Sequence, residues 1–283
     1  MNSSNKEYWE NAAKENAMFH VASSKTDWNL EEFLNDGKER VYKWVLPFLL
    51  AENKNPSDLT FLEIGCGTGR FAFHITQHVN KYIGIDISQA MVTEAEKNLS
   101  AFSNKEIMVG DGVSLSKIKN DSVDAVFSYA VLQHIYEQEV VLNYVKETVR
   151  VLKPGGVAKL NLLGGNAKSG IGLRFIQIKD LTERSLIRKY LNKILSKIGV
   201  SFRVGENGYL RKIVIRLLKK LLPEDFILPL VSYYKAGVGM RGEGVGYKIV
   251  LNSLEGMGCK VRIQNFESTN LSHWYWVLIK KNA

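Results

Sequence analysis

Glu63-Ile64-Gly65-Cys66-Gly67-Thr68-Gly69-Arg70 decides the fold, because this stretch joins an apolar run at residues 60–64 to a helix-like segment at residues 71–79. Its alternate glycines permit the positive φ angles of a tight turn and leave room for a ligand against the backbone. The spacing lacks the last glycine of the Gly-x-Gly-x-x-Gly dinucleotide fingerprint, which argues against NAD or FAD. The stretch therefore predicts a cofactor loop between a strand and a helix.

Short apolar runs alternate with amphipathic segments from residue 59 to residue 163, a pattern typical of parallel strands joined by helical crossovers. Apolar residues in these segments recur at helical spacing, as in Met91, Ala95 and Leu99, and Ser88 is expected to cap that helix. After a further helix at residues 250–257, two final runs predict an antiparallel hairpin. We expect an α/β fold with a doubly wound seven-stranded sheet, made of five parallel strands plus the C-terminal hairpin. The expected strands are residues 60–64, 82–85, 106–109, 123–129, 157–163, 260–266 and 274–279.

The pattern of apolar and charged residues changes near residues 58 and 165, which divides the chain into three parts. Residues 1–58 contain two aromatic-rich, helix-like stretches and are expected to form an N-terminal helical lid. Residues 59–165 and 241–283 are expected to form the cofactor-binding core. Residues 166–240 then form a helical insertion after the fifth strand.

Composition predicts a globular protein with a substantial core, because 45% of the 283 residues are hydrophobic. Two cysteines build neither a disulfide framework nor a four-ligand zinc site. No window reaches the roughly 18 apolar residues that span a bilayer, and the N-terminus lacks the apolar run of a signal peptide. We expect a soluble protein of the reducing cytoplasm.

Acidic residues end the next two strands of the expected sheet. Asp86 ends the second run, where a carboxylate can accept ribose hydroxyls, and Asp111 ends the third within Gly110-Asp111-Gly112. The turn Leu152-Lys153-Pro154-Gly155-Gly156 leads into the fifth run. Together with the glycine loop, this ordered set resembles the class I S-adenosylmethionine-dependent methyltransferases of the small-molecule type. The resemblance implies a Rossmann-like fold, S-adenosylmethionine as cofactor, S-adenosylhomocysteine as product and no metal.

The resemblance also implies which residues contact the cofactor. Taken singly, some of them have plainer explanations: Asp86 as a helix-capping acid, Met91 as a core residue and Cys66 as a loop filler. Tyr8 and Trp9 either close over the cofactor as an aromatic lid or belong to the core. The implied set is Glu63, Gly65, Cys66, Gly67, Thr68 and Gly69 for the methionine part, Asp86 for the ribose, Asp111 and Gly112 for the adenine, Ile87 and Met91 for the rings, with Tyr8, Trp9 and Tyr129 completing the set.

The acceptor side begins where the fourth run ends, in Phe127-Ser128-Tyr129-Ala130-Val131-Leu132-Gln133-His134. This segment is similar to that of small-molecule methyltransferases. It has neither the Pro-Pro-Tyr pattern of enzymes that methylate amino groups in DNA, RNA and proteins nor the Pro-Cys of cytosine-carbon methylases. Transfer from a sulfonium depends mainly on alignment. A hydroxyl acceptor also needs a base, for which His134 is the candidate and His20 a weaker one; the alternative for His134 is a structural hydrogen bond. His273 and Trp274, at the start of the last strand, either touch the acceptor or pack on a helix.

The formal charge of +9 is concentrated in one segment, because residues 168–220 hold 14 Lys or Arg against 3 acidic residues. Residues 184–221 contain two apolar stripes beside Lys and Arg, which predicts two basic amphipathic helices. Three roles are open for these helices. They either pack on the domain as a lid or dock peripherally on an anionic membrane to reach a lipid-linked acceptor. The third role is the capture of an anionic acceptor such as a phosphorylated sugar or a nucleic acid.

These observations favour methyl transfer to oxygen or nitrogen of a small-molecule or lipid-linked acceptor by in-line displacement. An RNA methyltransferase that uses the basic insertion is the first alternative, although the segment at residues 128–130 disfavours it. A non-catalytic binding module that retains the cofactor fold is the second alternative. The oligomeric state stays open.

Overall fold

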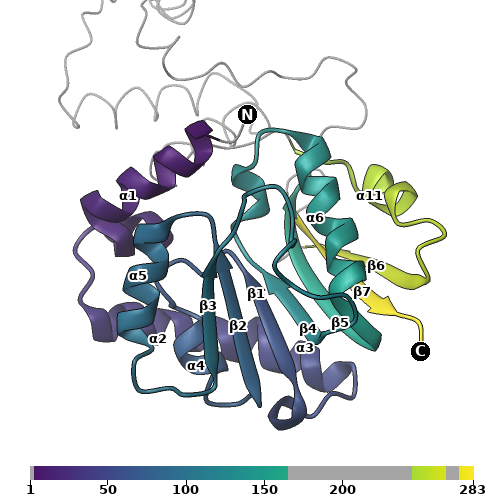
Figure 1. Cartoon of the computed structure of the whole chain (residues 1–283), viewed down its shortest axis with the longest axis horizontal. Coiled ribbons are helices and arrows are strands. Elements are labelled where there is room, and N and C mark those ends of the chain that lie inside the picture. The colour runs from purple at the N-terminus through teal and green to yellow at the C-terminus, as the bar shows by residue number, and fades with distance from the viewer. Residues whose placement is uncertain (1–2, 165–243, 266–273) are drawn as a thin grey trace, which may run out of the picture. The chain divides into compact units, whose positions relative to one another are not determined.

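The structure of the protein is a computed structural model that describes residues 3–164, 244–265 and 274–283 (Figure 1). The expected insertion at residues 166–240, with its basic stretches at residues 184–221, lies outside the described residues, as does His273. None of the helices within the described ranges combines the length and the apolar character that a membrane span requires.

Seven strands of the described chain form one mixed sheet in the order β3-β2-β1-β4-β5-β7-β6. The first five strands are parallel, β7 is antiparallel to β5, and β6 is antiparallel to β7 at the edge. This confirms the predicted sheet and hairpin, and the strand order reverses between β1 and β4. The strands are β1 (Thr60–Ile64), β2 (Lys81–Asp86), β3 (Lys105–Val109), β4 (Val123–Ser128), β5 (Leu152–Leu163), β6 (Cys259–Asn265) and β7 (Trp274–Lys281).

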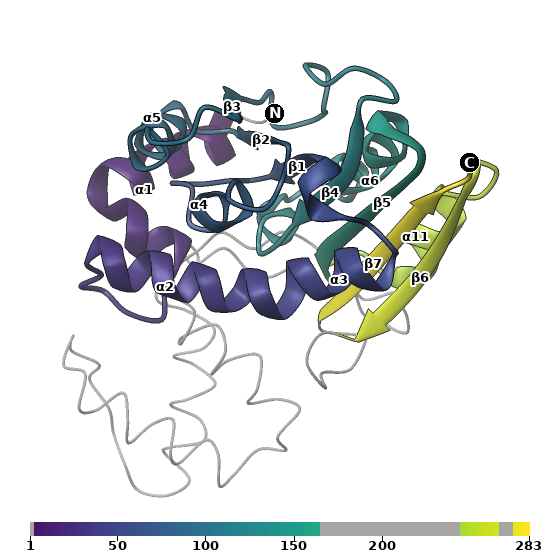
Figure 2. The ribbon, with the colours of Figure 1, turned by 90° about the horizontal axis from the view of Figure 1, so that it is seen from below.

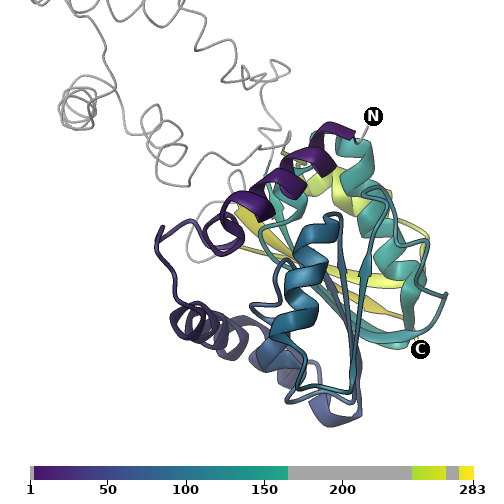
Figure 3. The same ribbon diagram turned by 60° about the vertical axis from the view of Figure 1, so that its left-hand side comes forward.

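Helices cover both faces of the sheet (Figure 3). Alternate residues of each strand face opposite sides, so Phe61 belongs to one apolar cluster and Leu62 to the other. The Phe61 cluster includes residues of α3 (Leu46–Ala51) and α4 (Ala72–Ile75), and the Leu62 cluster includes residues of α6 (Gln138–Val151) and α11 (Tyr247–Ser253). On the α3 and α4 side lie also α2 (Leu30–Arg40), the π-helical turn η1 (Val41–Val45) and α5 (Gln89–Asn98).

The helix predicted at residues 71–79 is wrong in its length, since α4 spans only Ala72–Ile75. The side chain of Thr76 donates a hydrogen bond to the Ala72 carbonyl (2.8 Å), and that of Gln77 donates to the Phe73 carbonyl (2.7 Å). The Ala72 carbonyl also accepts its helical bond from the Thr76 amide (2.9 Å), whereas the Phe73 carbonyl accepts from the side chain of Gln77 in place of the amide that would continue the helix. The chain then turns towards β2.

The N-terminal region is helical, as predicted, in α1 (Ser3–Val21), α2 and α3. Asn16 interrupts α1 with extended backbone angles, and its side-chain oxygen accepts a hydrogen bond from the Phe19 amide (3.1 Å). This is an N-cap, so a new helical turn begins there. Helices α2 and α3 are joined by η1 into one long element (Figure 2).

The π-helical turn η1 is stabilised by Lys159, a buried lysine of β5. Its ammonium donates a hydrogen bond to the Trp44 carbonyl (3.0 Å) and lies 4.6 Å from the ring centroid of Trp276. Burial lowers the pKa of Lys159 to about 8. Lys159 therefore ties η1 to the centre of β5.

A close backbone contact docks α2 on the end of the glycine loop. A Cβ atom added at Gly37 would lie 2.2 Å from the carbonyl oxygen of Arg70 and 2.8 Å from its Cγ. Only glycine lets the two backbones approach this closely.

We expect Gly37→Ala to lower the free energy of unfolding by roughly 1–3 kcal/mol, because the clash with Arg70 outweighs the gain in helix propensity. Urea unfolding measures the change. Asn35→Ala, at an exposed position of the same helix, is the control and should leave stability unchanged or slightly raised. Equal stability of Gly37→Ala and the wild type would show that α2 can shift away at no cost.

Candidate functional site

The glycine loop lies at the carboxyl end of β1, beside the strand-order reversal. Gly65, Gly67 and Gly69 have φ angles of +76°, +52° and +86°, as the tight turn requires. A Cβ atom at Gly65 would lie 2.2 Å from Cγ2 of Val131, on the segment after β4. The lack of a side chain at Gly65 therefore lets the segment after β4 pack against the loop. Within the described residues, the buried hydroxyl of Thr68 has no hydrogen-bond partner.

Asp86 links this loop to the end of β2. Its Oδ2 accepts a hydrogen bond from the Gly67 amide (2.9 Å), and its Oδ1 accepts one from the Ser88 amide (3.0 Å). Burial raises the pKa of Asp86, although these main-chain bonds oppose the shift. Each carboxylate oxygen can accept two hydrogen bonds, so the group retains capacity for ribose hydroxyls.

The α5 helix begins where the sequence predicts. The Ser88 hydroxyl accepts a hydrogen bond from the Met91 amide (3.2 Å), which confirms it as the N-cap. Met91 is buried and Ile87 is half-buried beside Asp86. Their predicted contacts with the cofactor rings stay predictions.

The carboxylate of Asp111 accepts hydrogen bonds from residues of its own loop. Its Oδ1 accepts hydrogen bonds from the amides of Val113 (2.8 Å) and Ser114 (2.7 Å), and its Oδ2 accepts from the hydroxyls of Ser114 (2.5 Å) and Ser116 (3.0 Å). Four donors fill the four lone-pair positions of a carboxylate. An adenine amino group would have to displace one of them, so the predicted contact to Asp111 stays a prediction, as does that to the buried, neighbouring Gly112.

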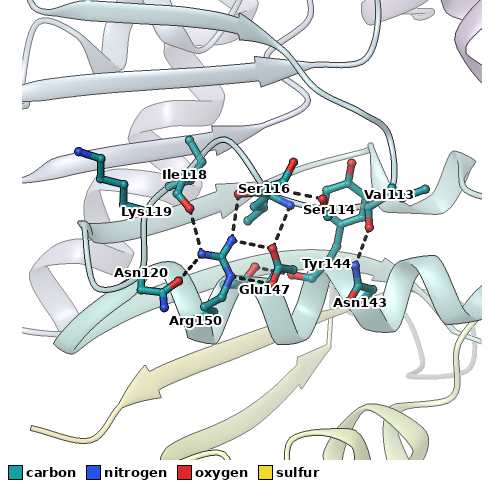
Figure 4. A network of polar contacts seen from close by, with 12 residues as sticks. Val113, Ser114, Ser116, Ile118, Lys119, Asn120, Asn143, Tyr144, Glu147 and Arg150 are labelled. Atoms are coloured by element: carbon teal, nitrogen blue, oxygen red, sulfur yellow. Dashed lines mark hydrogen bonds and ion pairs between the residues drawn. The ribbon is translucent and has the colours of Figure 1, made fainter.

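The same loop is clamped on α6 by residues that the sequence analysis missed (Figure 4). Arg150 donates hydrogen bonds to the carbonyls of Leu115 (2.9 Å) and Ile118 (2.9 Å) and forms an ion pair with Glu147 (2.6 Å). Glu147 in turn accepts a hydrogen bond from the Leu115 amide (3.2 Å). The three-residue spacing of Glu147 and Arg150 signals a helix ion pair, but it does not identify the loop they hold.

Glu63 is buried in β1 at 4% exposure. The Tyr82 hydroxyl donates a 2.6 Å hydrogen bond to its Oε2. Burial raises the pKa of Glu63 to about 7, against the opposing effects of this hydrogen bond and of the Arg70 charge. Burial therefore favours the protonated form of Glu63. Burial also raises the pKa of the Cys66 thiol, which makes a reactive thiolate unfavourable there.

Helix α1 carries Tyr8, Trp9 and His20 and brings them together with His134 of a distant segment. The Trp9 ring lies edge-on to His134 (5.1 Å between centroids), and Tyr8 lies edge-on to both Trp9 (5.2 Å) and His20 (6.3 Å). Asn5 donates a hydrogen bond to the His134 carbonyl (3.3 Å). The lid residues and both candidate bases therefore form one cluster.

Glu10 fastens the same helix to α5. Its Oε2 accepts hydrogen bonds from the Ser88 hydroxyl (2.8 Å) and the Ala90 amide (3.1 Å). A carboxylate at a helix N-terminus is favourable because it meets free amides and the positive end of the helix dipole. These contacts hold α1 beside the end of β2.

His134 is the last residue of a short 3₁₀ turn, η3 (Leu132–His134). The Gln133 side-chain nitrogen lies 3.0 Å from Nε2 of His134, so a tautomer with its hydrogen on Nδ1 would accept this bond. His20 lies 3.4 Å from Glu15. The roles of both histidines as bases stay predictions.

Tyr129, directly after β4, belongs to an aromatic cluster with Trp44 and Trp276. Its ring centroid lies 4.5 Å from that of Trp44 and 6.0 Å from that of Trp276. The Arg40 guanidinium donates to the Tyr129 hydroxyl (3.4 Å). Trp44 falls in the predicted helical region at residues 1–58 and Trp276 in the predicted strand at residues 274–279, and no sequence pattern indicates that either ring lies beside Tyr129.

Comparisons with known proteins agree with this architecture. Residues 62–160 match the methyltransferase domain family. A phosphoethanolamine N-methyltransferase of Triticum aestivum is 31% identical over 153 residues, which cover 53% of this chain and 28% of the relative. A tRNA (carboxymethyluridine(34)-5-O)-methyltransferase of Arabidopsis thaliana is 32% identical over 120 residues, which cover 41% of this chain and 27% of the relative. The chain thus spans little more than a quarter of the length of these two relatives.

Solved structures share the fold along most of the chain. The magnesium protoporphyrin IX methyltransferase of Synechocystis, crystallised with S-adenosylhomocysteine, aligns over 100% of both chains with a TM-score of 0.56 and 16% identity. The PH0226 protein of Pyrococcus horikoshii aligns over 93% of this chain and 98% of its own, with a TM-score of 0.52 and 17% identity. At these identities the likeness concerns the fold.

The raised pKa of Glu63 predicts that the ligand-free protein loses stability as pH rises. The folded-state pKa of about 7 lies above the ordinary 4.5, so between these values the folded chain binds more protons than the unfolded chain. The free energy of unfolding should therefore fall with rising pH in this window, by on the order of 2 kcal/mol from Glu63.

Urea unfolding at pH 5.5 and 7.5 measures this slope. Glu63→Gln keeps an acceptor for the Tyr82 hydroxyl and should flatten the slope, whereas the exposed Glu106→Gln should keep it. A Glu63→Gln protein with the full wild-type slope would contradict the prediction.

Proposed function

We propose that the chain contains a class I S-adenosylmethionine-dependent methyltransferase domain and that it methylates oxygen or nitrogen of a small-molecule or lipid-linked acceptor. The proposal rests on one observation: a hydrogen bond joins Asp86 to the glycine loop at the point where the strand order reverses. In open α/β sheets, ligands bind beyond the carboxyl ends of the strands at this point.

The residues present are compatible with the cofactor. The glycine loop offers backbone with no Cβ atoms in the way, the hydroxyl of Thr68 has no partner among the described residues, and Asp86 keeps acceptor capacity. In this proposal the glycine loop and Glu63 hold the methionine part, and Asp86 holds the ribose. When bound, S-adenosylmethionine supplies the electrophilic methyl carbon on its sulfonium.

The chain's own contribution would be alignment and exclusion of water. A well-aligned bimolecular step gains about 7–11 kcal/mol from positioning alone. Helix α1 is held at the site by Glu10 and by the contact of Trp9 with His134, so it can shield the reacting groups. For a hydroxyl acceptor, we propose that His134 accepts the proton at a ring nitrogen.

The acceptor class is supported by two observations. The Ser128-Tyr129-Ala130 segment lacks the Pro-Pro-Tyr pattern of enzymes that methylate amino groups in nucleic acids and proteins. The ring of Tyr129, which lies against the buried rings of Trp44 and Trp276, is also half-buried at this end of the sheet, and an aromatic face suits a small apolar body. One of the relatives named above is a phosphoethanolamine N-methyltransferase and the other is a tRNA methyltransferase. They therefore support methyl transfer but do not distinguish between these acceptor classes.

RNA methylation is the second candidate. It is favoured by the 14 Lys or Arg among residues 168–220 and by the tRNA-methylating relative. Basic segments bind phosphate backbones, and such binding weakens steeply with salt. For a lipid-linked acceptor, we propose instead that the same basic segment docks peripherally on a membrane. In either case we propose that the protein is cytoplasmic.

The cofactor assignment predicts that Asp86→Asn raises the dissociation constant of S-adenosylhomocysteine at least about tenfold, because hydrogen bonds to a charged group are lost. Calorimetric titration measures it, with Asp58→Asn at an exposed position as the control. An unchanged constant would remove Asp86 from the site. If the wild type binds no S-adenosylhomocysteine, the methyltransferase proposal fails and the non-catalytic module replaces it.

The acceptor assignment predicts where a labelled methyl group goes. With methyl-tritiated S-adenosylmethionine and separate metabolite, lipid and total tRNA fractions, we expect label in the metabolite or lipid fraction and none with Asp86→Asn. Label confined to tRNA, with tRNA binding that falls steeply as salt rises, would replace the proposal by the RNA alternative.

A further inference from the structure

Helix α1 contacts three of the elements that form the candidate site. Near its start, Asn5 donates a hydrogen bond to the carbonyl of His134, which lies on the segment after β4 (3.3 Å). In its middle, Glu10 binds the start of α5, beside which α1 lies (Figure 1). Its last residue, Val21, reaches the glycine loop. Helix α1 therefore crosses the approach to the glycine loop and to Asp86 from this side.

Val21 lies against Gly67, the glycine whose amide binds Asp86. A Cβ atom added at Gly67 would lie 3.0 Å from Cγ2 of Val21 and 3.6 Å from its Cγ1. Gly67 is buried, as are its neighbours Cys66 and Thr68. A glycine in such a loop leaves room beside its Cα atom for a ligand, and here a side chain of α1 fills that room. A ligand that uses this room has to displace Val21.

Glu10 is a charged contact between α1 and the start of α5. Burial alone would raise the pKa of Glu10, but the hydrogen bonds from Ala90 and Ser88 and the charge of Lys14 hold it below its ordinary value. Glu10 is therefore ionised at neutral pH, and its charge meets the positive end of the α5 dipole. Its side chain is 26% exposed, so water can replace these donors when α1 moves away.

Ser88 joins α1 to the cofactor side of the site by bonds that are separate from one another. Its hydroxyl donates to Glu10, and the same hydroxyl accepts from the Met91 amide. Its amide donates to Oδ1 of Asp86 (3.0 Å). The last two bonds do not involve Glu10, so a change at Glu10 leaves the cap of α5 and the position of Asp86 intact.

We propose that α1 is a gate on the cofactor site, which Glu10 fastens to α5 and which Val21 closes over the glycine loop. The inference rests on the proposed function, because it concerns how the cofactor of the same site enters and leaves. Both movements wait for the Glu10 contact to open, since Val21 occupies the room beside Gly67. A gate of this kind slows association and dissociation alike, and opening of such elements sets the turnover of many enzymes.

Hydrogen exchange of the protein without added cofactor tests the contact that fastens α1, by mass spectrometry of peptides from residues 3–21 at pH 7. We expect Glu10→Gln to exchange these amides about fivefold or more faster than the wild type, because glutamine brings no charge to the start of α5. Glu7→Gln, at an exposed position of the same helix, loses the same charge and should exchange as the wild type does. Equal exchange in Glu10→Gln and the wild type would overturn the inference.

Stopped-flow kinetics with S-adenosylhomocysteine test the gate itself. We expect Glu10→Gln to raise the association and dissociation rate constants about fivefold each and to keep the dissociation constant within about twofold, whereas Glu7→Gln changes none of them. Val21→Ala, which clears the room beside Gly67 with Glu10 in place, should also raise the association rate constant. Faster dissociation of Glu10→Gln with unchanged association would show that α1 binds the cofactor instead of gating it, and would overturn the inference.

The two proposals fail in different ways. If the wild type binds no S-adenosylhomocysteine, the proposed function fails, and the gate fails with it because no cofactor passes. If the wild type binds S-adenosylhomocysteine and Glu10→Gln has the same rate constants, only the gate is overturned and the proposed function stands.

Discussion

The hydrogen bond from the Gly67 amide to Asp86 joins the ends of β1 and β2, and the rest of the site is arranged around it. It exists because the loop can adopt positive φ angles and approach the strand ends without Cβ atoms. The other oxygen of Asp86 accepts from Ser88, which caps α5, and Ser88 also donates to Glu10 of α1. One carboxylate thus connects the sheet, the glycine loop, α5 and the helix proposed as a lid.

Ionisable groups are concentrated at this edge of the sheet. Glu63 and Arg70 are buried, and Asp86 and Asp36 are half-buried beside them. Such groups cost stability unless each charge finds a partner, and perturbed pKa values of this kind cluster at functional sites. Asp111 and its serine-rich loop represent the opposite arrangement, because every acceptor position there is filled by the loop itself. The site therefore combines groups with spare capacity and groups that only shape the backbone.

The sequence predicts the sheet well because buried parallel strands are continuous apolar runs, and the glycine loop identifies the first of them. It does not predict the end of α4, where the side chain of Gln77 donates to the Phe73 carbonyl. It also does not predict that Asp36 contacts Arg70, since that contact needs α2 docked through Gly37. The Trp9 and His134 contact is of the same kind, because each residue was a candidate but only the fold brings them together.

The attachment of α1 has a consequence for how the protein responds to temperature. The polar contacts of this helix include those of Glu10 with α5 and of Asn5 with η3, and it adds Ala12 to the buried residues, whereas the sheet has a large apolar cluster on each face. Elements with few buried contacts open at a lower free energy than the core. We therefore expect α1 to open at a lower temperature than the one at which the sheet itself unfolds.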